Sequence, residues 1–174
     1  MATKEKDNCK VVTGEVRFSY AHVFEPASFA GDESNKKYSC AILIPKKDKK
    51  TLDKCHAAIA TAMADGKLKS LKDNPLRDGD DERPDDEAYA GMMYVNAKST
   101  RKPQVVDANL DPIMDQDEFY SGCFGRASIT FYNYEFGGKK GVAVALNNLQ
   151  KTKDGERLAG GSSAEEDFSD DDLE

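Results

Sequence analysis

The strand-like segment that begins at Cys123 carries the side chains with the clearest chemical potential. Its residues alternate, and small or apolar side chains occupy one face: Cys123, Gly125, Ala127, Ile129 and Phe131. Aromatic rings, hydroxyls and a guanidinium occupy the other: Phe124, Arg126, Ser128, Thr130, Tyr132, Tyr134 and Phe136. Because nucleobases stack on rings while cations follow phosphates, the second face is a candidate platform for single-stranded nucleic acid. Another interpretation stays open, in which the tyrosines only cover a barrel mouth with their hydroxyls in water.

The segment around Tyr94 repeats this alternation. Tyr94, Asn96 and Lys98 share one face, opposite an apolar one. Basic residues elsewhere would extend the same surface by contacting phosphates, which position a strand without reading its bases. The full set of candidate nucleic-acid-binding residues is Arg17, Lys36, Lys37, Tyr94, Lys98, Arg101, Lys102, Phe124, Arg126, Tyr132, Tyr134, Lys139 and Lys140.

The chain is acidic overall because of two acidic segments, and the rest of it is basic. The formal net charge is -7, but residues 165–174 hold seven acidic residues and no basic one. Residues 78–87 hold seven more acidic residues and one arginine. Without these segments, 18 acidic and 24 basic residues remain, a net charge of +6. A basic body with an acidic tail is typical of a protein that uses the tail for interactions.

The C-terminal acidic run is the candidate partner-binding segment, because two apolar side chains lie among its charges. The residues expected to contact a partner are Phe168, Asp170, Asp171, Asp172 and Leu173. The Gly- and Ser-rich residues 159–164 would tether the run flexibly. Two alternatives stay open: a tail that only solubilises the protein, and an acidic protein that mimics DNA and inhibits a nucleic-acid enzyme.

Motifs for catalysis and metal binding are missing from the sequence. It contains neither the phosphate-binding and dinucleotide-binding glycine motifs nor the zinc-protease helix motif. Neither His22 nor His56 stands in a recognisable arrangement with a nucleophile. The acidic run at 78–87 fits the spacing of a calcium loop poorly, so a metal-dependent hydrolase is only a third alternative. We therefore expect a non-enzymatic protein with no metal and no cofactor.

The distribution of apolar residues and cysteines indicates a cytoplasmic protein without a membrane partner. The longest apolar runs, Cys40–Ile44 and Val142–Leu146, are five residues each, whereas a membrane-spanning helix needs about 20. Residues 1–8 have no apolar stretch that would suit a signal peptide. The four cysteines are widely spaced, which disfavours a disulfide framework or a zinc site.

Hydrophobic periodicity predicts a mainly β protein with one surface helix. The predicted strands are 11–24, 37–44, 91–99, 103–107, 120–136 and 141–149, with a hairpin turn at 137–141. Asp48 is expected to cap a helix over 49–64 that Gly66 ends. Pro26 is expected to end the first strand, residues 31–36 to form a polar loop, and residues 67–90 a mobile acidic loop. This order favours one antiparallel β-barrel over residues 10–158, between a disordered start (1–9) and the tethered tail (159–174).

Several blocks of the chain resemble the phage single-stranded DNA-binding proteins with an OB-fold. The blocks are Val16–Pro26, Lys37–Lys46, Tyr120–Ala127, Gly141–Leu149 and Asp154–Leu158. The resemblance implies an OB barrel with a helix between strands. It also implies sequence-independent protection of single strands during phage DNA replication and recombination, in the cytoplasm of the infected bacterium. The acidic tail would recruit phage or host replication proteins, such as a polymerase or helicase–primase, and compete with DNA. Many such tails end in phenylalanine, whereas this one ends Leu173-Glu174.

Overall fold

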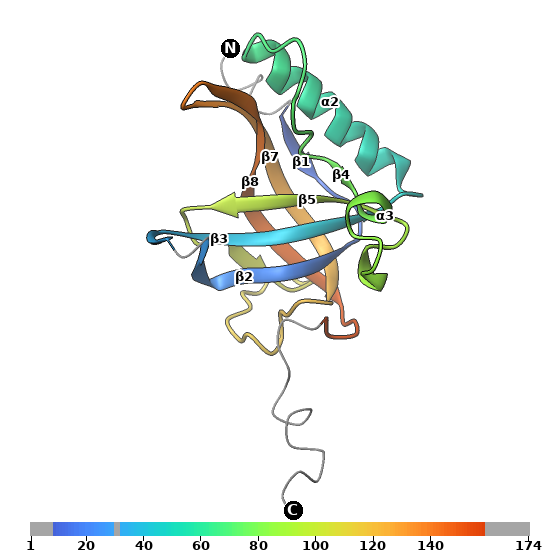
Figure 1. Ribbon diagram of the computed structural model, residues 1–174. Coiled ribbons are helices and arrows are strands. Elements are labelled where there is room, and N and C mark those ends of the chain that lie inside the picture. Colours follow the sequence, from blue (N-terminus) through green and yellow to red (C-terminus); the bar gives the residue numbers. More distant parts are fainter. Residues whose placement is uncertain (1–8, 30–31, 159–174) are drawn as a thin grey trace, which may run out of the picture.

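A computed structural model describes residues 9–29 and 32–158 (Figure 1). The mainly β fold with one long surface helix is confirmed. The strands are β1 (Lys10–Val12), β2 (Val16–Phe29), β3 (Asp32–Pro45), β4 (Arg77–Asp78), β5 (Met92–Ser99), β6 (Gln104–Val106), β7 (Phe124–Phe136) and β8 (Lys139–Lys153). The helices are α2 (Lys49–Asp65), α3 (Gly79–Glu82) and the 3-10 turn η1 (Glu87–Tyr89).

Five strands form a closed ring in the order β7-β2-β3-β5-β8, because β7 also pairs with β8. Within this ring, neighbouring strands are antiparallel except at one junction, where β5 runs parallel to β8 with Lys98 opposite Ala145. Because an odd number of strands cannot alternate direction all the way round a ring, the predicted antiparallel barrel closes through this one parallel junction. Five is also the strand number of an OB barrel. Outside the ring, β6 also runs parallel to β8.

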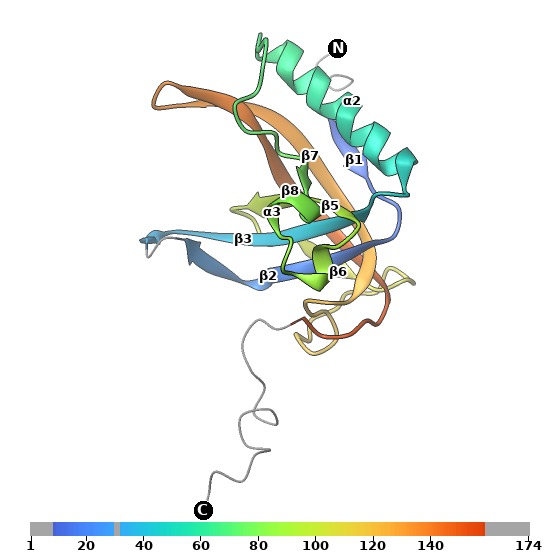
Figure 2. The same ribbon diagram turned by 45° about the vertical axis from the view of Figure 1, so that its right-hand side comes forward.

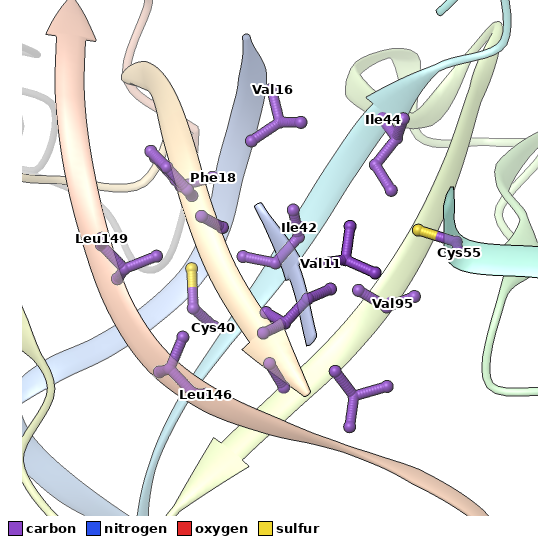
Figure 3. Packing of buried hydrophobic residues seen from close by; sticks show 14 of the residues in the cluster. Val11, Val16, Phe18, Cys40, Ile42, Ile44, Cys55, Val95, Leu146 and Leu149 are labelled. Atoms are coloured by element: carbon purple, nitrogen blue, oxygen red, sulfur yellow. The ribbon is translucent and has the colours of Figure 1, made fainter. Parts of the chain in front are cut away.

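The interior of the ring is filled with apolar side chains (Figure 3). Phe18, Ile42 and Phe131 are fully buried there. The predicted core face of β7 and of the residue before it is confirmed, because Cys123, Ala127, Ile129 and Phe131 are all at most 1% exposed. Figures 1 and 2 show the β2–β3 and β7–β8 hairpins projecting from the ring toward the same side of the molecule.

Helix α2 begins and ends close to where the sequence predicts. Asp48 caps it by accepting a hydrogen bond from the Thr51 N–H at 3.2 Å. At the other end, the Gly66 N–H donates to Ala62 O. The buried side of the helix packs on β1 and β7. Among the described residues, no helix combines the length and the apolar character needed to cross a membrane.

The alternation of core-facing and outward-facing side chains along strand β2 is interrupted at Tyr20. Ser19 pairs with Ala41, and the next regular pair is His22 with Ser39, so two residues of β2 face one of β3. This β-bulge moves Ala21 and Val23 to the core side and turns Tyr20 outward. Pro26 does not end the strand, which continues to Phe29. Beyond Arg17, β2 pairs only with β3, so the proline lies on a free edge, where it costs no ladder hydrogen bond.

Residues 67–90, here called the acidic excursion, contain β4, α3 and η1 where the sequence predicted only a loop. Lys46 binds Asp78 and Asp80, each at 2.8 Å. This hydrogen bonding to Lys46 lowers the pKa of both carboxyl groups. The excursion thus lies over the outer face of β3 and β5, where Ala41, Leu43, Tyr89 and Tyr94 form a small second core.

Candidate nucleic-acid interface

A cavity of about 360 Å³ lies between β5, the β7–β8 hairpin and residues 73–77. We call it the hairpin cavity. It brings together four of the predicted residues: Lys37, Lys98, Tyr132 and Tyr134. Arg77 adds a third cation, paired with Glu82 at 3.0 Å, and Asp73 is the carboxylate in the lining. Aromatic rings and an excess of positive charge therefore share one concave surface.

The two tyrosines share a face because they are two residues apart on β7. The two residues are 45% (Tyr132) and 38% (Tyr134) exposed, so both are accessible to a ligand. Small residues lie opposite them on β8: Ala143 faces Tyr132 and Gly141 faces Tyr134. A Cβ atom at Gly141 would lie 2.7 Å from the Tyr134 hydroxyl, so the glycine gives this ring room to lie across β8.

A second cavity of about 310 Å³, the central cavity, continues the first over β3 and β2. The two share Asn96 and Lys98 in their linings. The central cavity adds Tyr20, His22 and Arg83, and none of the described residues in its lining carries a carboxylate. Together the two cavities form a groove with cations along it and a pair of tyrosines at one end.

Tyr94, a predicted binding residue, lines neither cavity. Its side chain is 4% exposed and packs edge-on against Tyr89, with ring centroids 5.0 Å apart. Its hydroxyl donates to Glu82 at 2.8 Å, which lowers the pKa of that carboxyl. The alternation had placed Tyr94 correctly outside the main core, but the acidic excursion covers this part of the sheet with a second apolar layer.

Arg17 and Phe124 lie together but outside both cavities. The Arg17 guanidinium lies 5.3 Å from the Phe124 ring centroid. It also donates to the carbonyl oxygens of Gly122 (3.1 Å) and Glu156 (2.7 Å). Arg17 therefore joins the segment after β8 to the ring, a structural role that its position on a strand did not indicate.

The remaining candidates lie around the groove or elsewhere on the surface. Arg126 donates to the carbonyl oxygen of Thr13 at 2.9 Å and lines neither cavity. The Lys102 ammonium lies 6.0 Å from the Phe24 ring centroid. Exposed positions hold the others, Lys36, Arg101, Lys139 and Lys140, the last two at the tip of the β7–β8 hairpin. The candidate tail residues Phe168, Asp170, Asp171, Asp172 and Leu173 lie outside the described residues.

Sequence reasoning missed Tyr20, His22 and Arg83 as groove residues. Tyr20 and His22 reach it only through the bulge in β2, which no turn residue marks in the sequence. Arg83 stands within an acidic run that was expected to be a loop. Asn96 was placed on the correct face but was not chosen. In the part of the chain that the structure describes, no cluster of three or more His, Cys, Asp or Glu side chains could hold a metal ion.

Comparison with known proteins identifies the family. Residues 9–174 match the family model described as Enterobacter phage Enc34, ssDNA-binding protein. This chain belongs to the Enc34 phage single-stranded DNA-binding protein family. It is 34% identical over 175 residues to putative protein p50 of Acyrthosiphon pisum secondary endosymbiont phage 1, covering 92% of this chain and 93% of that protein.

Solved structures agree with this family membership. The Enc34 single-stranded DNA-binding protein in complex with ssDNA matches with a TM-score of 0.74 and 26% identity, over 87% of this chain and 90% of that one. The bacteriophage T7 single-stranded DNA-binding protein gp2.5 shares the fold, with a TM-score of 0.59 and 17% identity, over 94% and 96% of the two chains. The Enc34 family is one of phage DNA-binding proteins and not of enzymes, in agreement with the sequence analysis.

Proposed function

We propose that this member of the Enc34 family binds single-stranded DNA, without sequence preference, in the groove formed by the hairpin and central cavities. The observation that carries the proposal is the meeting of Tyr132 and Tyr134 with Lys37 and Lys98 in one cavity of a chain from this family. The rings would stack on bases of any sequence, and the cations would lie along the phosphates.

The groove residues fit this ligand better than they fit an acidic mimic of DNA. A mimic would present its carboxylates on an ordered outer surface. In the acidic excursion, Asp78 and Asp80 are bound to Lys46, and Glu82 is bound to Arg77 and Tyr94. These carboxylates hold the excursion on the sheet, beside a groove in which the charged lining residues that the structure describes are mostly cations.

The salt dependence of binding tests the proposal directly. Affinity for a fluorescent oligothymidine, measured by anisotropy, is expected to fall with salt at a slope of about -0.7 per phosphate neutralised. The variant Lys37→Gln should reduce the slope by about 0.7, because it removes one cation from the groove. Lys50→Gln, an exposed change on α2, serves as the matched control and should leave the slope unchanged. A slope near zero for the native protein would contradict binding through phosphates.

We further propose that the protein acts in phage DNA replication and recombination in the cytoplasm of the host, and that residues 165–174 recruit replication proteins. The seven acidic residues of this run carry the same sign of charge as phosphate. Leu158, the last described residue, donates its N–H to Ser121 O at 2.9 Å. The described chain therefore ends beside Ser121, close to the start of β7, and a short tether from there would keep the acidic charges near the groove at an effective concentration of about millimolar.

Removal of residues 165–174 is expected to tighten binding to single-stranded DNA, because the acidic run would no longer compete for the groove. The gain should be largest at low salt, where charges are least screened. Anisotropy titrations of the full and shortened chains at two salt concentrations measure it. A chain in which Glu and Asp of the run are replaced by Gln and Asn controls for length. Equal affinities at both salt concentrations would leave recruitment or solubility as the role of the tail.

A further inference from the structure

Tyr20 stands between the central cavity and a third cavity, which lies on the other side of β2. This third cavity has a volume of about 560 Å³. Tyr20, His22, Asp86, Ser121 and Leu158 contribute to its lining, and we call it the Ser121 cavity. Because Tyr20 and His22 line both cavities, the two hollows adjoin at these side chains. The groove is therefore continued past β2.

The bulge in β2 presents the Tyr20 ring to the surface in an unusual backbone conformation. Tyr20 has a φ angle of 48°, in the left-handed region that non-glycine residues seldom adopt. The neighbouring Ala21 N–H donates to the Ser121 hydroxyl at 3.0 Å, which fixes the backbone there. The side chain remains 47% exposed although it is a large ring. A fixed, strained backbone that displays an aromatic ring is a feature often found where a ligand binds.

Arg83 fixes the orientation of this ring. Its guanidinium carbon lies 5.2 Å from the Tyr20 ring centroid, and its Nη1 donates to the Tyr20 hydroxyl at 3.0 Å. The same guanidinium lies 5.1 Å from the buried Tyr89 ring. Arg83 lines the central cavity but not the Ser121 cavity. Arg83 thus contacts the Tyr20 ring from the central cavity and is absent from the lining of the Ser121 cavity, which the same ring borders.

We propose that Tyr20 stacks on a base of the bound single strand and carries the strand over β2 into the Ser121 cavity. This inference rests on the proposed function and extends its groove. The chemistry of the Ser121 cavity suits a base rather than a phosphate, because its polar groups include the Asp86 carboxylate and the Ser121 hydroxyl. A carboxylate repels phosphate but accepts hydrogen bonds from the N–H groups of bases, including the ring N–H of thymine. The phosphate on the other side would meet Arg83 and His22 in the central cavity.

A fluorescence experiment tests this stacking directly. The chain contains no tryptophan, so Tyr20→Trp introduces a single indole. Saturating oligothymidine of about 20 nucleotides is expected to quench its fluorescence strongly, as base stacking does. Met114→Trp, at an 82% exposed position that lines none of the three cavities, is the matched control and should show little quenching. Tyr132→Trp reports on the proposed groove itself.

The pattern of results separates the two proposals. Quenching at position 132 without quenching at position 20 would overturn the inference and leave the proposed function standing. No quenching at either position, together with no binding of DNA by the native chain, would overturn the proposed function. Quenching at both positions and none at 114 would support the extended path.

A second variant removes the ring without straining the fold. In Tyr20→Gly, the new glycine readily adopts the positive φ angle of this position, so the bulge should remain. Its affinity for the 20-nucleotide strand is expected to fall about 5- to 150-fold, the range for loss of one stacked base. Tyr20→Phe keeps the ring, loses only the hydroxyl that Arg83 binds, and should stay near the native affinity. An affinity of Tyr20→Gly within twofold of native, in a protein with native thermal stability, would refute the stacking role.

Discussion

Replacing both Tyr132 and Tyr134 by alanine is expected to weaken binding of single-stranded DNA by about 2–6 kcal/mol, at least roughly 30-fold. Each stacked base contributes about 1–3 kcal/mol when its ring is truncated to alanine. The two rings share one cavity and lie two residues apart on the same strand, so each single variant should weaken binding in the same direction. The two losses need not add exactly, since neighbouring residues can be coupled.

Affinity and stability must be measured together for these variants. Both rings are more than a third exposed, and the opposite face of β7 supplies the core, so the unfolding temperature should change little. Met114→Ala, at a highly exposed position away from the cavities, is the control. If either tyrosine variant unfolds at ambient temperature while its folded fraction binds normally, the ring belongs to the core and the site assignment is wrong.

Phe131→Ala is expected to lower stability and not DNA affinity, with a loss of about 3–5 kcal/mol in the free energy of unfolding. Phe131 is adjacent to Tyr132, but its side chain is 0% exposed and lies in the main core. Truncation would remove buried apolar surface and leave a cavity. The side chains around it, held by the closed ring, can fill that cavity only in part. Typical domains have only about 5–15 kcal/mol of stability, so this single change removes a large share of it.

Urea unfolding followed by circular dichroism measures this loss, and anisotropy measures binding of the folded fraction. The folded fraction of Phe131→Ala should bind DNA with nearly native affinity, since the groove face of β7 is unchanged. The pair Phe131→Ala and Tyr132→Ala thus separates the two faces of one strand. A Phe131→Ala protein as stable as the native one would mean that this side chain is not part of the packed interior.

The sequence predicted those features that depend on short-range periodicity. Alternation along 123–131 identified the core face of β7, and the Asp48 cap identified the start of α2. It could not predict features that depend on contacts between distant segments. The bulge at Tyr20 arises in the pairing of β2 with β3, and no residue in β2 alone marks it. The burial of Tyr94 depends on the acidic excursion folding onto β5, through ion pairs between Lys46 and residues more than 30 positions away.

Contacts between distant segments also decide which of the predicted binding residues lie in the groove and which do not. Lys37, Lys98 and the two β7 tyrosines meet because ring closure brings β3, β5 and the β7–β8 hairpin to one side. Arg17 shares a strand with residues near the groove, but its guanidinium is used by the carbonyl oxygens of Gly122 and Glu156. Charge and residue type predicted the kind of ligand, whereas the tertiary fold decides which cations are available to it.

The filled interior of the strand ring has a topological consequence. Apolar side chains, among them Phe18 and Ile42 (Figure 3), occupy the space that a hollow ring would offer, so no polymer can pass through it. The groove lies on the outside of the ring and is formed by surface cavities that are partly open to solvent. DNA bound there need not be threaded from an end. If DNA binds in the proposed groove, the protein would load onto the middle of a gap or onto a closed circle, and would leave without sliding to a terminus.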